Sequence, residues 1–167
     1  NYSHLEYITD SDLNNYASIT GIKVDALLSP VLSVKDTKNT YKGGTTAGFS
    51  LASTESGGLL SLEVIQLFSI TTYLNGKKQE TIAVGGASSG GVGLDLIKIP
   101  GSDAVSVDVC VKTTKDFDEI YLMQGGLHVE AINQLSIRYA FVGDPKEVLL
   151  TYDGVETYGI ELGLGEK

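Results

Sequence analysis

Residues 68–84 read FSITTYLNGKKQETIAV, two runs of strand-forming residues on either side of Asn75-Gly76. The Asn-Gly dipeptide is typical of a type I′ turn, because both residues tolerate the positive φ angles that match such a turn to the twist of the joined strands. β-branched and aromatic residues are frequent in the flanking runs, 68–74 and 77–84. The stretch therefore predicts an antiparallel β-hairpin.

Short runs of the same kind recur along the chain, each bounded by Gly, Asp, Ser or Pro. They predict further strands at 31–35, 45–51, 94–99, 104–112, 117–123, 135–142, 148–151 and 158–164. Brief helix candidates lie at 10–16, 60–67 and 127–134. A chain of 167 residues has the usual length of one domain, and its 20 glycines suit many turns between short strands. We expect a single all-β domain spanning residues 1–167.

An internal repeat appears when the chain is shifted by 67 residues. Eight of the 27 residues from 58 to 84 are then identical to their counterparts, and a one-residue gap also aligns Thr45-Thr46-x-x-Phe49 with Thr113-Thr114-x-x-Phe117. Neither copy, approximately 45–84 or 113–151, could cover its own apolar face, so we expect the two to pack face to face around one core. The alternative is that the two copies lie side by side in one pair of sheets, as in a jelly roll. The predicted fold is an antiparallel β-sandwich, jelly-roll or Ig-like, built from two internally similar halves.

Charge and hydropathy argue against several classes of protein. The 12 Lys and Arg against 21 Asp and Glu give a net charge of −9, so nucleic acid would be repelled unless the lysines clustered on one face, and along the sequence they are scattered. No run approaches the ~18 apolar residues that a membrane helix needs. We therefore expect no nucleic-acid partner and no transmembrane segment in this chain. The first residue is Asn1, so we expect any targeting segment to have been removed or to lie outside the chain.

Catalytic motifs are weak. Residues 86–90 spell the G-x-S-x-G of serine hydrolases, but glycines and a predicted strand follow instead of the helix that such a nucleophile requires. The two histidines, His4 and His128, have no second ligand at metal-binding spacing. A carboxylate pair of the glycoside-hydrolase type stays open among the 21 acidic residues. We predict a protein that is not an enzyme and has no cofactor, with calcium as the one alternative.

That alternative rests on Asp10, Asp12 and Asn14, whose oxygen side chains alternate as in the first part of a calcium loop. The EF-hand pattern fails further on, because Asn15 stands where Gly is expected and Gly21 where the closing Glu is expected. Two interpretations stay open. One is a looser calcium site with ligands from elsewhere, and the other is a turn in which these side chains bond local backbone N–H groups.

The candidate ligand-binding residues are Tyr16, Tyr41 and Lys42. Exposed aromatic rings commonly stack on the apolar faces of sugars, and nearby charged or polar side chains can supply hydrogen bonds. The alternative is that these tyrosines bury their rings and leave only the hydroxyl in water.

Five segments together resemble the β-sandwich modules of surface-exposed adhesins and lipoproteins of Bacteroidetes. They are ITDSDLNNYA (8–17), AGF (47–49), TYLNG with QE (72–76 and 79–80), FDEI (117–120) and LSIRYAFV (135–142). The resemblance implies export, an extracellular or cell-surface location, and adhesion or glycan contact without catalysis.

We therefore expect a non-enzymatic cell-surface adhesion or ligand-binding module that contacts a glycan or a surface protein through loops at one end. The alternative is a structural spacer or assembly subunit of a surface appendage, adding strands edge to edge. The sequence does not specify an oligomeric state.

Overall fold

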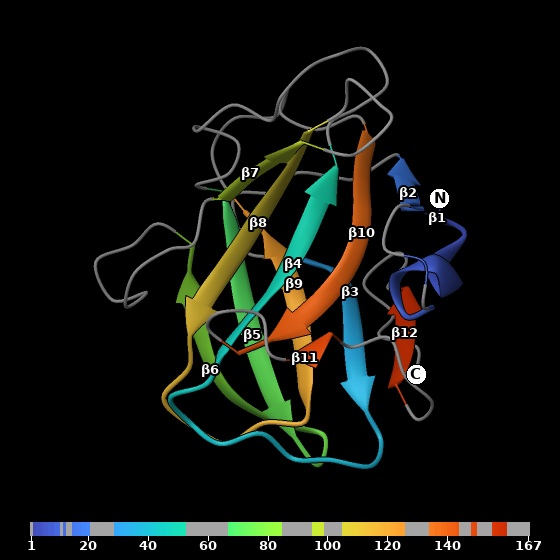
Figure 1. The fold of residues 1–167 in the computed structure, drawn as a ribbon. Helices are drawn as coiled ribbons and strands as arrows, with labels where there is room; N and C mark the ends of the chain where they lie inside the picture. The colour runs from blue at the N-terminus through green and yellow to red at the C-terminus, as the bar shows by residue number, and fades with distance from the viewer. Residues whose placement is uncertain are drawn as a thin grey trace.

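The computed structural model describes residues 2–10, 12, 15–20, 29–52, 67–84, 95–98, 105–125, 134–143, 148–149 and 155–159. Its strands form two antiparallel sheets, which lie one in front of the other in Figure 1. Sheet A contains, in spatial order, β1 (Tyr2–Ser3), β2 (Ala17–Thr20), β10 (Gln134–Val142), β4 (Thr46–Ala52), β8 (Val105–Lys112) and β7 (Asp95–Lys98), with β11 (Val148–Leu149) also paired to β10. Sheet B contains β12 (Val155–Gly159), β3 (Ser29–Asp36), β9 (Glu119–Gln124), β5 (Phe68–Leu74) and β6 (Lys77–Ala83).

Four nested strand pairs define the connectivity of the sandwich. β2 pairs with β10, β3 with β9, β4 with β8, and β5 with β6, so each pair encloses the next along the chain. The chain is thus arranged as one long antiparallel hairpin folded over into two sheets, which is the connectivity of a jelly roll. The prediction of an all-β antiparallel sandwich is confirmed, and the strand order selects the jelly roll over the Ig-like alternative.

The two copies of the sequence repeat do not form one layer each. The first copy supplies β4 to sheet A and β5 and β6 to sheet B, and the second supplies β9 to sheet B and β10 and β11 to sheet A. β4 pairs with β10 and β5 with β9, so the two copies lie side by side in both sheets, which is the alternative arrangement, and do not pack face to face as one layer each. The aligned Thr-Thr-x-x-Phe motifs differ in structure, because Phe49 lies in β4 whereas Phe117 precedes β9. Structural similarity of the two halves stays a prediction.

The hairpin at 68–84 forms as predicted. Asn75 and Gly76 have φ angles of 51° and 80°, the two left-handed positions of a type I′ turn. β5 and β6 pair from Ser69↔Ala83 to Leu74↔Lys77, with one irregularity between Thr72 and Tyr73. β6 is the last strand of sheet B, which explains its many exposed side chains.

The hydrophobic core fills the space between the sheets. Ala47, Phe49 and Leu51 occupy alternate positions of β4, are fully buried, and belong to one cluster with residues of sheet B. The largest fully buried side chains are Phe49, Phe68, Phe117, Ile8, Leu32, Leu51, Ile70, Ile120, Leu122, Leu135, Ile137 and Gln124. Each large apolar side chain buried in this way contributes about 1.5–3 kcal/mol.

The secondary structure of the described residues differs from that predicted from the sequence mainly near the N-terminus. A 3-10 helix occupies Leu5–Ile8, and Asp10, Asp12, Asn15 and Tyr16 are not helical. The short strands β1 and β2 were not predicted, because they depend on tertiary pairing, with β2 hydrogen-bonded to β10. The other two helix candidates lie mostly outside the described residues, as does most of the predicted strand 158–164. Within the described part of the chain, no helix is long and apolar enough to span a membrane.

Gly48 allows β4 to approach β8 closely. A Cβ atom added to Gly48 would overlap the carbonyl oxygen of Val109 and would lie 2.6 Å from the Cβ of Cys110.

We predict that Gly48→Ala lowers the free energy of unfolding by about 2–3 kcal/mol, since the two strands must separate. Gly76→Ala is the matched control, because nothing lies within 4 Å of the added Cβ and only the φ of +80° opposes it. We expect Gly76→Ala to lower the free energy of unfolding by about 1 kcal/mol. Urea unfolding of both variants measures the difference, and equal losses would contradict this account.

Candidate functional site

Three chain connections meet at one end of the sandwich, the lower end in Figure 1. They are the β3–β4 connection (37–45), the β5–β6 turn (75–76) and the β8–β9 connection (113–118), here called the loop end. Backbone hydrogen bonds join the β3–β4 and β8–β9 connections: Tyr41 and Phe117 exchange N–H···O bonds of 2.7 and 2.9 Å, and the Gly44 N–H donates to the Thr113 carbonyl at 2.8 Å. The β5–β6 turn is held by a side chain, because the Asn75 backbone N–H donates to Oδ2 of Asp118 at 3.2 Å. The loop end is therefore a continuation of the strand pairing.

Gly43 brings the β3–β4 connection against the β8–β9 connection. An added Cβ at this position would lie 2.5 Å from the Thr114 carbonyl oxygen and 2.8 Å from the Lys115 nitrogen. Because these obstructing atoms are backbone atoms, only a residue without a side chain allows the two connections to pack this closely.

Asp36 organises the β3–β4 connection from within. Its side chain is 2% exposed, and Oδ1 accepts the backbone N–H groups of Lys38 and Asn39 at 2.9 and 3.0 Å. Oδ2 accepts the Asn39 side-chain amide at 3.2 Å and the Tyr41 hydroxyl at 2.5 Å. A buried carboxylate needs several donors to offset its desolvation, and the folded connection provides them.

Two further carboxylates hold the β8–β9 connection. Glu80 accepts the backbone N–H groups of Thr114 and Lys115 at 2.8 and 3.0 Å, and the Thr114 hydroxyl at 2.6 Å. Asp116 accepts the Gly43 N–H at 2.9 Å. Each carboxylate lies on a different chain segment from the backbone groups it accepts. The charged groups thereby fix the connections relative to one another.

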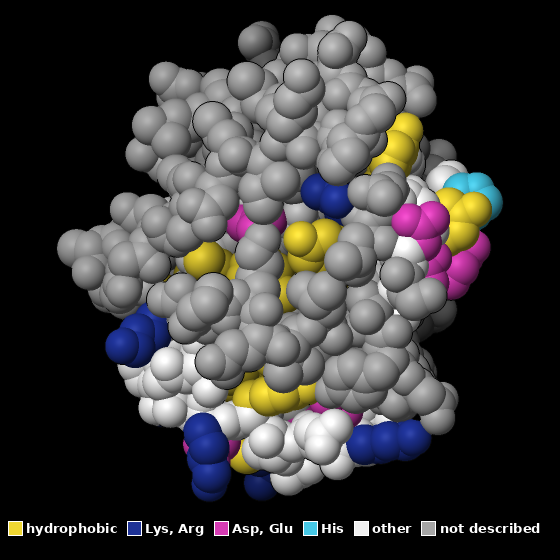
Figure 2. Space-filling model, in the orientation of Figure 1, with side chains coloured by type: hydrophobic (Ala, Val, Ile, Leu, Met, Phe, Trp, Pro, Cys, Tyr) yellow, Lys and Arg dark blue, Asp and Glu magenta, His cyan; other side chains and the backbone are white. Residues whose placement is uncertain are grey.

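Lysines gather around this end, although they are scattered along the sequence. Seven of the 12 cationic residues of the chain belong to the loop end or to the strand ends that lead into it: Lys35, Lys38, Lys42, Lys77, Lys78, Lys112 and Lys115. Six of them are exposed and Lys35 is half-buried. Figure 2 shows Lys and Arg side chains projecting along the lower rim of the molecule. Sequence analysis missed this cluster because it depends on which strand ends the topology brings together.

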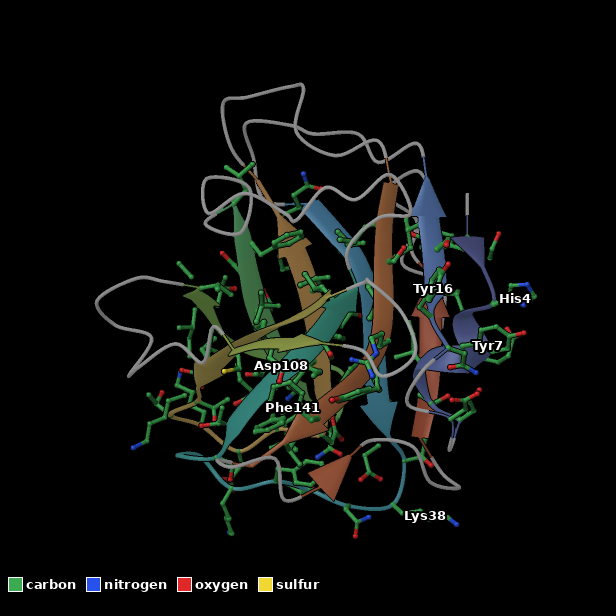
Figure 3. All side chains as sticks on the ribbon, turned by 45° about the horizontal axis from the view of Figure 1, so that its top comes forward. His4, Tyr7, Tyr16, Lys38, Asp108 and Phe141 are labelled. Atoms are coloured by element: carbon green, nitrogen blue, oxygen red, sulfur yellow. The ribbon has the colours of Figure 1, made fainter. Side chains whose placement is uncertain are left out.

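Two of the three predicted ligand-binding residues lie at the loop end. Tyr41 is half-buried, with its hydroxyl on Asp36 and its ring centroid 5.4 Å from that of Phe117. Lys42 is 88% exposed, and its Nζ lies 3.7 Å from a carboxylate oxygen of Asp116. Tyr16 lies elsewhere, beside the N-terminal segment that carries His4 and Tyr7 (Figure 3). The structure therefore does not unite Tyr16 with Tyr41 and Lys42 in one site.

The proposed calcium residues form a local turn in the described part of the chain. Oδ1 of Asp10 accepts the Asp12 backbone N–H at 3.0 Å, and Oδ2 accepts the Asn15 side-chain amide at 2.6 Å. This is the turn interpretation of the motif. Asn14 lies outside the described residues, as do residues 86–90 and His128, and the calcium site stays a prediction. Among the residues that the structure describes, no group of three or more His, Cys, Asp or Glu could hold a metal ion.

No family model, curated protein or solved structure matches this chain. The resemblance to Bacteroidetes surface modules therefore stays a prediction.

We predict that Asp36→Asn lowers the free energy of unfolding by about 1–3 kcal/mol, because an amide replaces one acceptor oxygen with a donor that faces other donors. Asp116→Asn is the control: its side chain is 43% exposed and accepts one backbone N–H. We expect it to cost less than about 1 kcal/mol. Urea unfolding compares the two variants. If Asp116→Asn lowered the free energy of unfolding as much as Asp36→Asn does, the organising role of Asp36 would be refuted.

The exposed N-terminal turn provides a pH-dependent contact. The pKa of the Glu6 carboxyl is lowered, first by a hydrogen bond from its own backbone N–H and then by the His4 side chain, whose Nδ1 lies 3.2 Å from Oε1. His4 also stacks on Tyr7, with ring centroids 4.5 Å apart. Because the folded-state pKa is lowered, the stabilisation is complete above the unfolded-state pKa and is lost as the pH falls through the folded-state value.

We predict that His4→Ala raises the pKa of Glu6 part of the way to its ordinary value, since the backbone hydrogen bond persists. An NMR titration of the Glu6 carboxyl measures this pKa, and Tyr7→Ala, which leaves the His4 side chain in place, is the comparison variant. An unchanged Glu6 pKa in His4→Ala would show that the imidazole makes no contribution.

Proposed function

We propose that the chain is a non-enzymatic cell-surface adhesion or ligand-binding module that contacts its ligand through the loop end. One observation carries this proposal: three connections are hydrogen-bonded into one body whose outer rim is lined with exposed lysines. Loops held by a rigid scaffold are the usual location of binding residues in β-sandwich proteins.

The rigidity of the loop end supports binding. Association is opposed by the entropy of ordering loops and side chains, so a surface that is ordered before it meets its ligand retains more of its interaction energy. Asp36 and Glu80 already order the connections through bonds to backbone N–H groups.

The same bonds support a role without catalysis. General acid–base chemistry needs carboxylates that reach a substrate proton. Asp36, Glu80 and Asp116 instead accept protein N–H groups. The cell-surface location is supported by the resemblance of the sequence motifs to Bacteroidetes surface modules.

Assembly through sheet edges is the second candidate. Both sheets are open, and β6 is the last strand in the described order of sheet B, an arrangement that can accept an additional strand. Lys77 and Lys78 are exposed on this strand, and lysines on an edge strand oppose uncontrolled pairing. Ligand binding at the loop end is therefore the favoured proposal.

Blocking the loop end tests the proposal. Thr40 is exposed there, Ser3 is exposed on β1, and the single native cysteine, Cys110, is buried. Thr40→Cys and Ser3→Cys can each be coupled to a maleimide-polyethylene glycol chain and applied to a glycan array. We predict that the wild-type signal is lost when the polymer is attached at position 40 and is kept when it is attached at position 3.

Equal array signals from the two conjugates would refute the loop end as the binding surface. No array signal from the wild type, together with multimers that grow with protein concentration, would favour the assembly subunit.

A further inference from the structure

We infer that the loop end binds an anionic polysaccharide, a polymer whose sugars carry sulfate or carboxylate groups. This inference rests on the proposed function and adds the chemical class of the ligand. The observation behind it is a separation of charge: the lysines of the loop end project outward, and most of its carboxylates are turned into the protein.

The formal charge of this region is opposite to that of the whole chain. Residues 35–45, 73–80 and 112–119 contain seven lysines and five acidic residues, a net charge of +2 in a chain of net charge −9. Three of the five acids are nearly inaccessible, with Asp36 2%, Asp118 8% and Glu119 1% exposed. They accept hydrogen bonds from Lys38, Asn75 and Ser33 respectively. The outer surface is therefore more positive than the formal count indicates.

Most of the lysines around the loop end have ammonium groups that can bind an anionic ligand. Within the described part of the chain, Lys77, Lys78 and Lys112 form no ion pair. Lys42 pairs with Asp116 at 3.7 Å while remaining 88% exposed, and such a surface pair is weak and readily exchanged. The Nζ of Lys115 bonds the neutral carbonyl of Gln79 at 3.3 Å.

The lysines come from both layers of the sandwich. Lys112 ends β8 in sheet A, Lys77 and Lys78 begin β6 in sheet B, and Lys38 projects from the β3–β4 connection at the same end (Figure 3). A ligand that contacts all of them must extend across the end of the molecule. A charged polymer does so and gains from several linked contacts at once.

Three observations favour a polysaccharide over nucleic acid. No aromatic side chain in residues 35–45, 73–80 and 112–119 is fully exposed for stacking on bases, because Tyr41 and Tyr73 are half-buried and Phe117 is buried. Arg138, the one arginine of the chain, is 5% exposed in sheet A, so the rim offers ammonium groups and no guanidinium fork for phosphate. The acidic remainder of the chain would repel duplex DNA, which carries one charge per ~1.7 Å. A polysaccharide with fewer charges is repelled less.

The test compares dextran sulfate with neutral dextran, which share a backbone, and adds polygalacturonate and a short DNA duplex. We expect dextran sulfate or polygalacturonate to bind, dextran not to bind, and log K to fall linearly with log salt. Binding of only one anionic polymer identifies its charged group as the one recognised.

The triple variant K77Q/K78Q/K112Q should weaken this binding about tenfold or more and reduce the salt slope. The control K77R/K78R/K112R keeps the charge at the same positions and should bind like the wild type. A second control, S3E/A83E, lowers the net charge at two exposed positions outside the loop end and should have a much smaller effect. Circular dichroism checks that all variants are folded.

Equal affinity for dextran and dextran sulfate, full binding by the glutamine variant, or tighter binding of the DNA duplex would each overturn the inference. The polymer-blocking experiment separates its failure from that of the proposed function. If the conjugate at position 40 blocks only neutral glycans, the binding surface stands and the charge inference fails. If the conjugate at position 40 blocks no glycan binding, both the proposed binding surface and the inference of an anionic ligand fail.

Discussion

Antiparallel pairing between strands distant in sequence is the constraint on which the rest of this structure depends. β3 pairs with β9 and β4 with β8, so the β3–β4 and β8–β9 connections must leave the sheets at the same end. The bridge between Tyr41 and Phe117 then extends the pairing beyond the strands. The loop end is thus a product of strand register, and its β3–β4 and β8–β9 connections are joined by the same kind of backbone hydrogen bond as the strands.

At the loop end the carboxylates accept hydrogen bonds from the backbone, and the lysines form the exposed surface. Backbone N–H groups in the connections need acceptors, and Asp36 and Glu80 supply them from neighbouring segments. Lysine side chains are long and strongly hydrated, so they extend into water. An acidic chain can therefore carry a positive surface without any excess of lysine in its composition.

The sequence was sufficient to predict most of the strands and the fold class, because alternating side chains and the Asn75-Gly76 turn are local signals. It also indicated Tyr41 and Lys42, which lie at the loop end. It could not show that Lys112 and Lys77 share that end, since their proximity follows from strand order. Nor could it decide whether the repeated segments pack face to face or lie side by side in both sheets, because strand order settles that question. Short strands such as β1 and β2 have little intrinsic preference for the extended conformation, and they form only because neighbouring strands pair with them.

The nested strand order also has a kinetic consequence. The innermost of the four nested pairs, β5 and β6, closes the shortest loop among them, and each enclosing pair must close a longer one. Loop-closure entropy grows with length, so we expect the Asn75-Gly76 hairpin to form before the three pairs that enclose it. The hairpin that can fold earliest therefore also carries Lys77 and Lys78, the first two residues of its second strand, on the outer rim.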